Sequence, residues 1–178
     1  MIDYIGDISV NDAKTLQRLA QASTRVLEFG CGASTQVLAA YAQRVISIET
    51  EQTWIDKTIA NLARLELSNF EFMLYQNFSP NGEYDLIFDD GVDGLRLVFA
   101  NNVWNFLRIG GKLCFHDTRR SQDIKNVCDF IALHSPEIES VVINVDHSNI
   151  TVITKKLAEF YENWNLVEGK ELWQYGKA

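Results

Sequence analysis

Short apolar runs alternate with segments of helical periodicity along most of the chain. The runs are rich in Val, Ile, Leu and Phe, as in RVISIE and YDLIFD, and such short continuous runs predict strands. The segments between them carry apolar residues three and four positions apart, which predicts amphipathic helices. Alternation of the two patterns indicates an α/β fold, in which a doubly wound, mostly parallel sheet has helices on both faces.

We expect seven strands and five helices. The strands are Arg25–Phe29, Arg44–Glu49, Phe70–Tyr75, Tyr84–Asp89, Lys112–His116, Ile138–Val145 and Ile150–Lys155. The helices are Asn11–Ala22, Ser34–Gln43, Glu51–Leu67, Asp93–Leu107 and Ser121–His134. Gly110 and Gly111 are expected to end the fourth helix. The short turn at 146–149 makes the last strand antiparallel to its neighbour.

The chain has 178 residues, which fits one domain, and we expect residues 1–178 to form it. Residues 1–22 make up its N-terminal helix region, and residues 156–178 make up an aromatic tail. In this tail Leu157, Phe160, Tyr161 and Trp164 share one helical face. Packing on the sheet edge, a contact in a homodimer and a flap over a pocket are the alternatives that this pattern leaves open.

The charge of the chain argues against several partners. Its 16 Lys and Arg residues stand against 24 Asp and Glu residues, and the formal net charge of −8 opposes binding to nucleic acid or anionic membranes. No apolar run approaches the roughly 20 residues that cross a bilayer, and the N-terminus does not resemble a signal peptide. Cys31, Cys114 and Cys128 lack metal-ligand and CxxC spacing. Reduced thiols and a cytoplasmic location are therefore expected.

A glycine turn follows the first expected strand, in the stretch VLEFGCGAST. Gly30 and Gly32 allow a ligand to approach the backbone, and Ser34 and Thr35 begin a helix whose N-terminal amides face the same crevice. Glu49 ends the second strand, where a carboxylate accepts hydrogen bonds from ribose hydroxyls. In open α/β sheets the ligand crevice lies beyond the carboxyl ends of the strands. The turn and Glu49 together predict a nucleoside pocket.

Two details bear on which nucleoside binds. The dinucleotide fingerprint GxGxxG lacks its third glycine here, because Thr35 stands in that place. Glu28 would put a negative charge close to a pyrophosphate, whereas the ammonium and sulfonium groups of S-adenosylmethionine suit a carboxylate. The residues favour S-adenosylmethionine, and an NAD-binding oxidoreductase stays as the less favoured alternative.

The chain resembles the class I S-adenosylmethionine-dependent methyltransferases through VLEFGCGAST, RVISIE, YDLIFDDG and LRIGGKLCFHD, in the family's order. The resemblance implies a Rossmann-like, seven-stranded sheet with an antiparallel last strand. It places Glu28 and the two glycines at the methionine end of the cofactor and Glu49 at the ribose. Asn77 and Phe78 would contact the adenine. The expected cofactor-binding residues are Glu28, Gly30, Cys31, Gly32, Ser34, Thr35, Glu49, Asn77, Phe78 and Asp89.

Asp90 and Asp117 follow the fourth and fifth strands, and they resemble two metal aspartates of the small catechol-type O-methyltransferases. Their carboxylates could converge on Mg²⁺, with Asp89 as a third oxygen. Two departures from that family are Thr118, in place of an asparagine ligand, and Asp93, in place of a catalytic lysine. Metal binding therefore stays open. Without a metal, Asp90 would contact the ligand or substrate and Asp117 would cap or orient.

Two histidines are candidate bases. His116 precedes Asp117 on the fifth strand, so the two point to opposite faces, and we expect Asp117 to face the pocket. His116 is then a packed histidine or a base. His147 lies in the exit turn of the sixth strand and is a base or an exposed turn residue. The candidate catalytic residues are Asp90, Asp117, His116 and His147.

The sequence thus predicts a soluble methyltransferase that uses S-adenosylmethionine and acts on a small molecule. By the resemblance the acceptor atom is a hydroxyl oxygen, whose proton a metal at Asp90 and Asp117 or a histidine base would help to remove. The missing lysine and asparagine leave a second class open, a non-catalytic protein that binds S-adenosylmethionine or another nucleoside.

Overall fold

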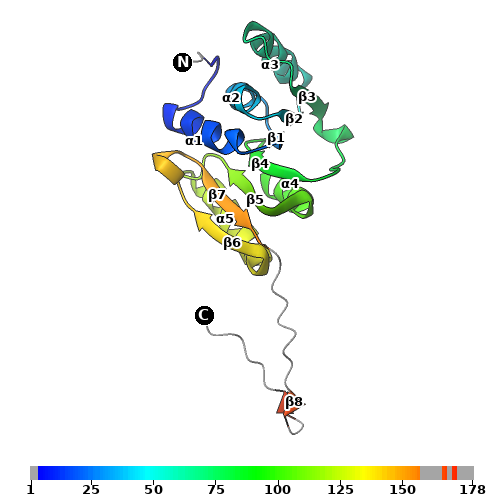
Figure 1. The fold of residues 1–178 in the computed structure, drawn as a ribbon. Coiled ribbons are helices and arrows are strands. Elements are labelled where there is room, and N and C mark those ends of the chain that lie inside the picture. Colours follow the sequence, from blue (N-terminus) through cyan, green and yellow to red (C-terminus); the bar gives the residue numbers. More distant parts are fainter. Residues whose placement is uncertain (1–3, 157–165, 168–169, 172–178) are drawn as a thin grey trace.

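A seven-stranded sheet with helices on both sides makes up the body of the molecule (Figure 1). The structure, a computed structural model, describes residues 4–156, 166–167 and 170–171. Its strands are β1 Arg25–Phe29, β2 Arg44–Glu49, β3 Phe70–Leu74, β4 Tyr84–Asp89, β5 Leu107–Phe115, β6 Ile138–Val142 and β7 Thr151–Lys155. They lie in the order β3-β2-β1-β4-β5-β7-β6.

All neighbouring strands from β3 to β5 pair in parallel, whereas β7 lies between β5 and β6 and is antiparallel to both. This arrangement confirms the predicted Rossmann-like, doubly wound, mostly parallel sheet with an antiparallel last strand. The chain order reverses between β1 and β4, because β1 is followed by β2 on one side and by β4 on the other. In open α/β sheets a ligand crevice forms at such a reversal.

Within the described residues, one α-helix precedes β1 and four α-helices connect strands. They are α1 Val10–Gln21, α2 Ala33–Tyr41, α3 Gln52–Arg64, α4 Arg96–Val103 and α5 Ser121–His134. Short 3-10 turns are η1 Tyr75–Asn77, η2 Trp104–Phe106, η3 Ser135–Glu137 and η4 Val145–His147, and β8 Leu166–Val167 pairs with β9 Lys170–Glu171. The side chain of Ser9 caps α1 by accepting a hydrogen bond from the Asp12 amide at 3.1 Å.

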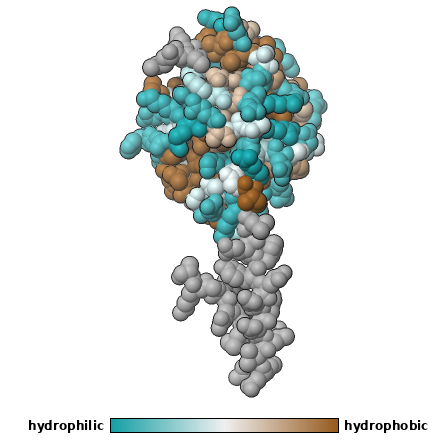
Figure 2. Space-filling view, viewed as in Figure 1, coloured by the Kyte–Doolittle hydropathy of each residue, from teal (hydrophilic) through white to brown (hydrophobic). Residues whose placement is uncertain are grey.

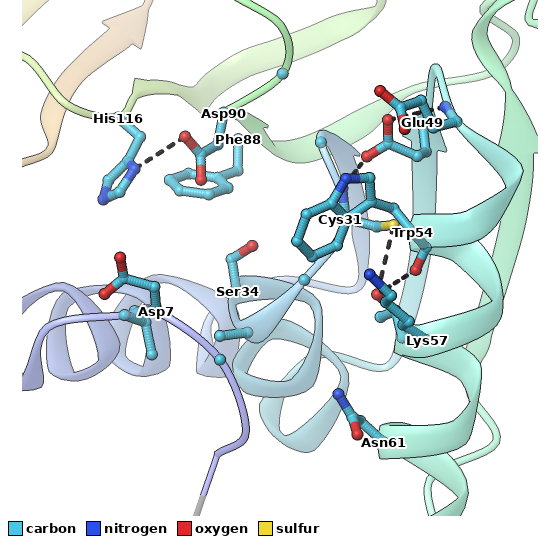
Figure 3. Close-up of a pocket in the computed structure, with 18 of the residues that line it drawn as sticks. Asp7, Cys31, Ser34, Glu49, Trp54, Lys57, Asn61, Phe88, Asp90 and His116 are labelled. Carbon is cyan, nitrogen blue, oxygen red and sulfur yellow. Dashed lines mark hydrogen bonds and ion pairs between the residues drawn. The ribbon is translucent and has the colours of Figure 1, made fainter.

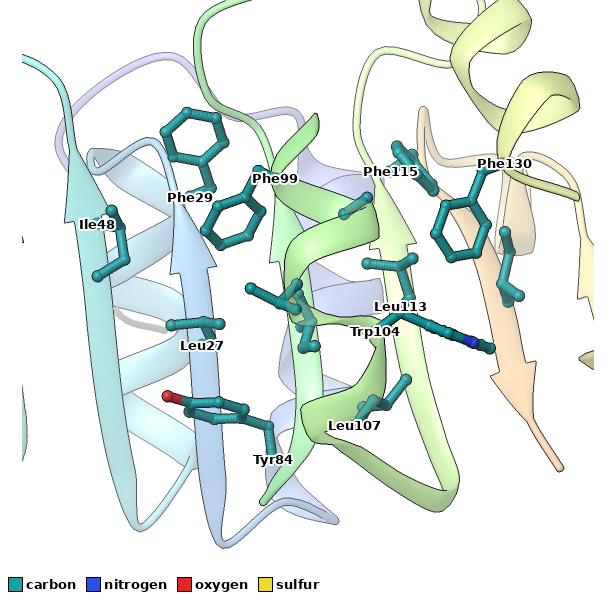
Figure 4. Close-up of a cluster of buried hydrophobic side chains, with 14 of the residues drawn as sticks. Leu27, Phe29, Ile48, Tyr84, Phe99, Trp104, Leu107, Leu113, Phe115 and Phe130 are labelled. Carbon is teal, nitrogen blue, oxygen red and sulfur yellow. The ribbon is translucent and has the colours of Figure 1, made fainter. Parts of the chain in front are cut away.

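Two hydrophobic clusters lie on opposite faces of the sheet, because successive residues of a strand point to opposite sides. Phe29 of β1 faces the cluster built with α4 and α5, where its ring stacks on that of Phe99 with centroids 4.5 Å apart (Figure 4). Val26 belongs to the other cluster, to which α1, α2 and α3 contribute Leu16, Leu38 and Leu62. Burial on both faces explains why β1 reads as a continuous apolar run.

The fourth helix was expected to span Asp93–Leu107, and its predicted C-terminal end is wrong. α4 stops at Val103, and β5 begins at Leu107, five residues before the predicted strand. Gly110 lies inside this strand with φ +76°, at an irregularity where the pairing shifts between Tyr84 and Leu86. The glycine pair thus permits a bulge in a strand, rather than ending a helix.

The tail lies largely outside the described residues. Leu157, Phe160, Tyr161 and Trp164 are not described, so the alternatives for this segment stay predictions. Within the residues that the structure describes, no helix is both long enough and apolar enough to cross a membrane.

Candidate functional site

A cavity of about 710 Å³ opens where the carboxyl ends of β1, β2 and β4 meet, at the reversal of strand order (Figure 3). Ligand pockets commonly measure about 300–1,000 Å³. Three groups of residues line it. The glycine turn and the residues at the ends of β2, β4 and β5 form one wall, the side of α3 forms a second, and the N-terminal segment Ile5–Ile8 forms a third.

The glycine turn leaves room over the backbone. Gly30 has φ +88°, and a Cβ on it would lie 2.3 Å from the backbone oxygen of Asp90, so only glycine fits there. Gly32 differs, because a Cβ on it would meet no atom within 4 Å. Gly32 lines the cavity, and the space above it is therefore free for a ligand that approaches the main chain.

Glu28 does not line the cavity. Its side chain is fully buried and accepts hydrogen bonds of 2.6 Å from the hydroxyls of Ser34, Thr35 and Ser47. Burial raises the pKa of the Glu28 carboxyl to about 7, although the three hydroxyls oppose the shift. Glu28 thus connects the residues after the glycine turn to β2. Among its three hydroxyl partners, Ser34 lines the cavity.

Glu49 lies on the cavity wall and its carboxylate is largely occupied. Oε1 accepts from the amides of Thr50 and Glu51, at 2.5 and 3.1 Å, and Oε2 accepts from the Cys31 amide at 3.1 Å. A carboxylate oxygen has two lone pairs, so Oε2 can accept one more hydrogen bond. Burial raises the pKa of the neighbouring Cys31 thiol to about 12, which keeps that sulfur unreactive.

His116 and Asp90 meet at the other end of the cavity. His116 Nδ1 lies 2.9 Å from Asp90 Oδ1, and its Nε2 lies 3.5 Å from Asp12 Oδ2. Burial by itself would lower the pKa of His116, but the carboxylates of Asp12 and Asp90 outweigh it and raise the pKa to about 10. The ring is therefore an imidazolium near neutral pH, which can donate hydrogen bonds but cannot take up a proton.

His116, and not Asp117, lines the cavity, which is the reverse of the expected orientation. The alternation of side chains holds only inside a strand, and β5 ends at Phe115. Asp117 takes the left-handed conformation with φ +57°, and its Oδ1 accepts a hydrogen bond from Asn149 Nδ2 at 2.8 Å. Asp117 thus orients the loop before β7.

Five other expected site residues do not line this cavity, and one of them is Thr35, whose hydroxyl donates to Glu28. Asn77 and Phe78 do not line it; Phe78 packs near Phe99 and borders a second cavity of about 360 Å³. Asp89 is fully buried, and burial raises its pKa well above its usual range. His147 is outside the cavity, and its carbonyl accepts a hydrogen bond from Arg119 at 3.0 Å.

Sequence reasoning missed one wall of the cavity. Trp54, Lys57 and Asn61 of α3 line it, three and four positions apart and hence on one helix face. Trp54 is 48% exposed and the Lys57 ammonium lies 4.7 Å from its ring centroid. An apolar residue in an amphipathic helix is normally expected to face the core, but the buried residues of α3 include Ile55 and not Trp54.

The N-terminal wall was also missed. The backbone of Ile5 both donates to and accepts from the fully buried side chain of Gln36, at 3.0 and 2.7 Å. This pair of hydrogen bonds fixes the segment next to the start of α2. Figure 3 shows Asp7 and Ser34 on the opposite side of the cavity from Asp90 and His116. Neither hydrogen bond could be foreseen from the sequence, because the partners are 31 residues apart.

The residues named for Mg²⁺ do not fit that ion. One ligand atom each of Asp90, His116 and Asp117 lies within 4.8 Å of the others. However, Asp90 Oδ1 already faces His116 and the guanidinium of Arg96, at 2.9 and 3.1 Å. Asp117 Oδ2 lies 3.3 Å from Arg120. Mg²⁺ needs oxygen ligands in a near-octahedral arrangement, and these oxygens are shared with fixed cations instead.

Comparison with known proteins identifies the fold. No protein-family model and no curated protein matches the chain. Among solved structures, an O-methyltransferase from Bacillus cereus in complex with S-adenosylhomocysteine matches with a TM-score of 0.69 and 20% identity, over 85% of this chain and 84% of that one. The O-methyltransferase TomG from Streptomyces achromogenes, in complex with S-adenosylmethionine, matches at 0.70 and 16%, over 85% and 82%.

The same fold also occurs with a different kind of acceptor. An rRNA methylase from Streptococcus thermophilus matches with a TM-score of 0.63 and 15% identity, over 85% of this chain and 100% of that chain. The chain therefore has the fold of class I methyltransferases, and the fold does not by itself select the acceptor.

Proposed function

We propose that the protein is an S-adenosylmethionine-dependent methyltransferase that acts on a small-molecule acceptor, at a hydroxyl oxygen. The observation that carries the proposal is the open space over Gly32, in a cavity bounded by Glu49 on one side and Asp90 on the other. A ribose and a cationic group can approach the main chain there between two carboxylates. The structural neighbours, which include proteins solved with S-adenosylmethionine or S-adenosylhomocysteine, support the same choice of ligand.

The residues fit the cofactor as follows. Oε2 of Glu49 has a lone pair left for a ribose hydroxyl. Asp90 offers a partly exposed carboxylate, 26% accessible, to a positive charge. Trp54 supplies an aromatic surface on the α3 wall. When bound, S-adenosylmethionine supplies an electrophilic methyl group whose sulfur leaving group needs no proton.

The protein must then align the acceptor and receive its proton. His116 cannot serve as the base, because both ring nitrogens face carboxylates and the ring stays protonated. The cavity carboxylates of Asp7 and Asp90 are left as proton acceptors. His116 holds Asp90 in place through its Nδ1, 2.9 Å from Asp90 Oδ1. No step requires a metal ion.

A non-catalytic protein that binds S-adenosylmethionine is the second candidate. The protonated state of His116 favours it, because a hydroxyl acceptor then lacks a histidine base. Charge still argues against nucleic acid as the acceptor, since the chain carries a formal charge of −8.

Thermal unfolding with different nucleosides tests the proposal. S-adenosylhomocysteine at about 100 times its dissociation constant should stabilise the fold by about 2.7 kcal/mol, and NAD should not. Stabilisation by NAD alone would overturn the proposal in favour of an oxidoreductase. Binding of S-adenosylhomocysteine without methyl release across a panel of phenols, alcohols and carboxylic acids would favour the binding protein over the enzyme.

A further inference from the structure

Arg96 is the buried centre of an acidic cluster beside the cavity. It is the first residue of α4 and is 4% exposed. Its Nε donates to the Gly91 carbonyl at 2.7 Å, and its Nη1 donates to the His116 carbonyl at 3.2 Å. These two backbone contacts hold the guanidinium across the ends of β4 and β5, so its position is fixed by the fold itself.

Four carboxylates surround this guanidinium. Nη2 lies 3.1 Å from Asp90 Oδ1, 3.7 Å from Asp93 Oδ1 and 3.8 Å from Asp117 Oδ2. Nη1 lies 3.1 Å from Asp123 Oδ1, a carboxylate whose side chain is 1% exposed. Arg96 Nη2 thus faces three carboxylates at once, as a metal ion bound by the same carboxylates would.

The same carboxylates include those that converge with His116 as possible ligands of a metal ion. A divalent ion placed between Asp90 and Asp117 would lie within a few ångströms of the Arg96 guanidinium and would be repelled by it. Arg120 adds a second positive charge, 3.3 Å from Asp117 and 2.9 Å from Asp93. The positive charge that these aspartates require is therefore already present in the chain.

We propose that the Arg96 guanidinium takes the place of a divalent metal ion at this cluster and holds Asp90 at the cavity wall. Arg96 does not line the cavity, whereas Asp90 does, so Arg96 is a positioning residue that acts through Asp90. The consequence for catalysis rests on the proposed methyltransferase function. The expected exclusion of a metal ion does not rest on that function, because it depends only on the four carboxylates and the two arginines.

Calorimetric titration with MgCl₂ and MnCl₂ tests the inference on protein freed of metal with a chelator. Wild type should show no saturable binding in the millimolar range. Arg96→Met removes the cation and leaves the carboxylates, so it should bind one equivalent of Mn²⁺ with a dissociation constant at least about tenfold below the highest concentration at which wild type shows no saturation. Arg44→Met is the control, since it removes the same charge from an exposed pair with Glu71; it should bind no metal.

A second readout separates positioning from a merely structural role. Arg96→Met should bind S-adenosylhomocysteine more weakly than wild type, and Mn²⁺ should restore that affinity by fixing Asp90 again. Methyl release by wild type should be the same in EDTA and in Mg²⁺, within about twofold. Failure of wild type to bind S-adenosylhomocysteine would refute the proposed function and leave the metal titration to decide the role of Arg96.

Several results would overturn the inference. One is saturable Mg²⁺ or Mn²⁺ binding by wild type, and another is a folded Arg96→Met variant that gains no metal binding. If Arg96→Met does not fold, Arg96→Lys decides, because it keeps a cation among the same carboxylates. Arg96→Lys should fold and stay free of metal. If Arg96→Lys also fails to fold, the guanidinium serves only to hold the structure together through its hydrogen bonds. If Arg96→Lys binds a metal ion, a positive charge at this position does not exclude the ion.

Discussion

At the scale of single residues, the surroundings of each ionisable group decide what it can do. Glu28 is a carboxyl with three hydroxyl donors and no access to the cavity. His116 is an imidazole between Asp12 and Asp90. The sequence identified both residues as candidates, but their ionisation follows from partners that the fold brings from distant segments. Two predictions depend on these surroundings.

The pH dependence of stability should reveal the buried Glu28 carboxyl. Its pKa is raised from 4.5 to about 7 in the folded state, so the folded state holds the proton more tightly than the unfolded state. Wild type should therefore lose about 3 kcal/mol relative to Glu28→Gln as pH rises from about 4.5 to about 8, since one pKa unit equals about 1.4 kcal/mol. Melting curves of both proteins at four pH values check this, and parallel curves would contradict it.

The same experiment on His116 should show loss of stability over a higher range of pH. Its pKa is raised from 6.5 to about 10, so its contribution is complete below about 6.5 and is lost as pH rises through about 10. The stability advantage of wild type over His116→Gln should be a few kcal/mol at pH 6 and should be almost gone above pH 10. A difference that grows with pH would show that the imidazole is neutral in the folded state.

At the scale of elements, the site depends on where strands and helices end. The bounds of β1, β2, β4 and α5 agree with the sequence prediction to the residue, because each has a strong pattern and a clear break. The start of β5 could not be predicted, since Gly110 and Gly111 read equally well as a helix end. Because β5 ends at Phe115, the alternation of side chains does not extend to the next two residues, and His116 rather than Asp117 lines the cavity.

Gly32 should be required for binding and not for folding. A Cβ on Gly32 meets no protein atom within 4 Å, so Gly32→Ala should change the melting temperature little while filling the space above the turn. We predict a loss of S-adenosylhomocysteine affinity of at least about tenfold, or 1.4 kcal/mol. Gly94→Ala is the matched control, because Gly94 also has no atom within 4 Å and does not line the cavity. Equal affinities for the two variants would count against the site.

The exposed face of α3 should contribute to nucleoside binding. Trp54 lines the cavity and is 48% exposed, so Trp54→Ala should alter stability by no more than about 0.5 kcal/mol. Loss of its aromatic surface should cost about 1–3 kcal/mol of affinity for S-adenosylhomocysteine, the usual value for stacking of a base. Ile59→Ala serves as the control on the same helix, since Ile59 is 41% exposed and outside the cavity. Calorimetry should show an effect in the first variant alone.

At the scale of the whole molecule, contacts between distant segments complete the site. Asp12 of α1 faces His116 after β5, and its other oxygen accepts a hydrogen bond of 2.6 Å from the Asn149 amide before β7. Asn149 in turn holds Asp117. The sheet class and the glycine turn follow from local patterns in the sequence. This chain of contacts does not, because Asp12 is more than 100 residues away from His116 and Asn149, Asn149 is 32 residues away from Asp117, and none of these pairs carries a local signal.

A crystal structure of the protein with S-adenosylhomocysteine tests the central claim most directly. The account predicts the ligand in the cavity at the ends of β1, β2 and β4, with its main-chain contact over Gly32 and a ribose hydroxyl within hydrogen-bond distance of Glu49 Oε2. Crystals soaked in MnCl₂ should show no anomalous peak between Asp90 and Asp117. Ligand density at any other place on the molecule, or none at saturating concentration, would contradict the account.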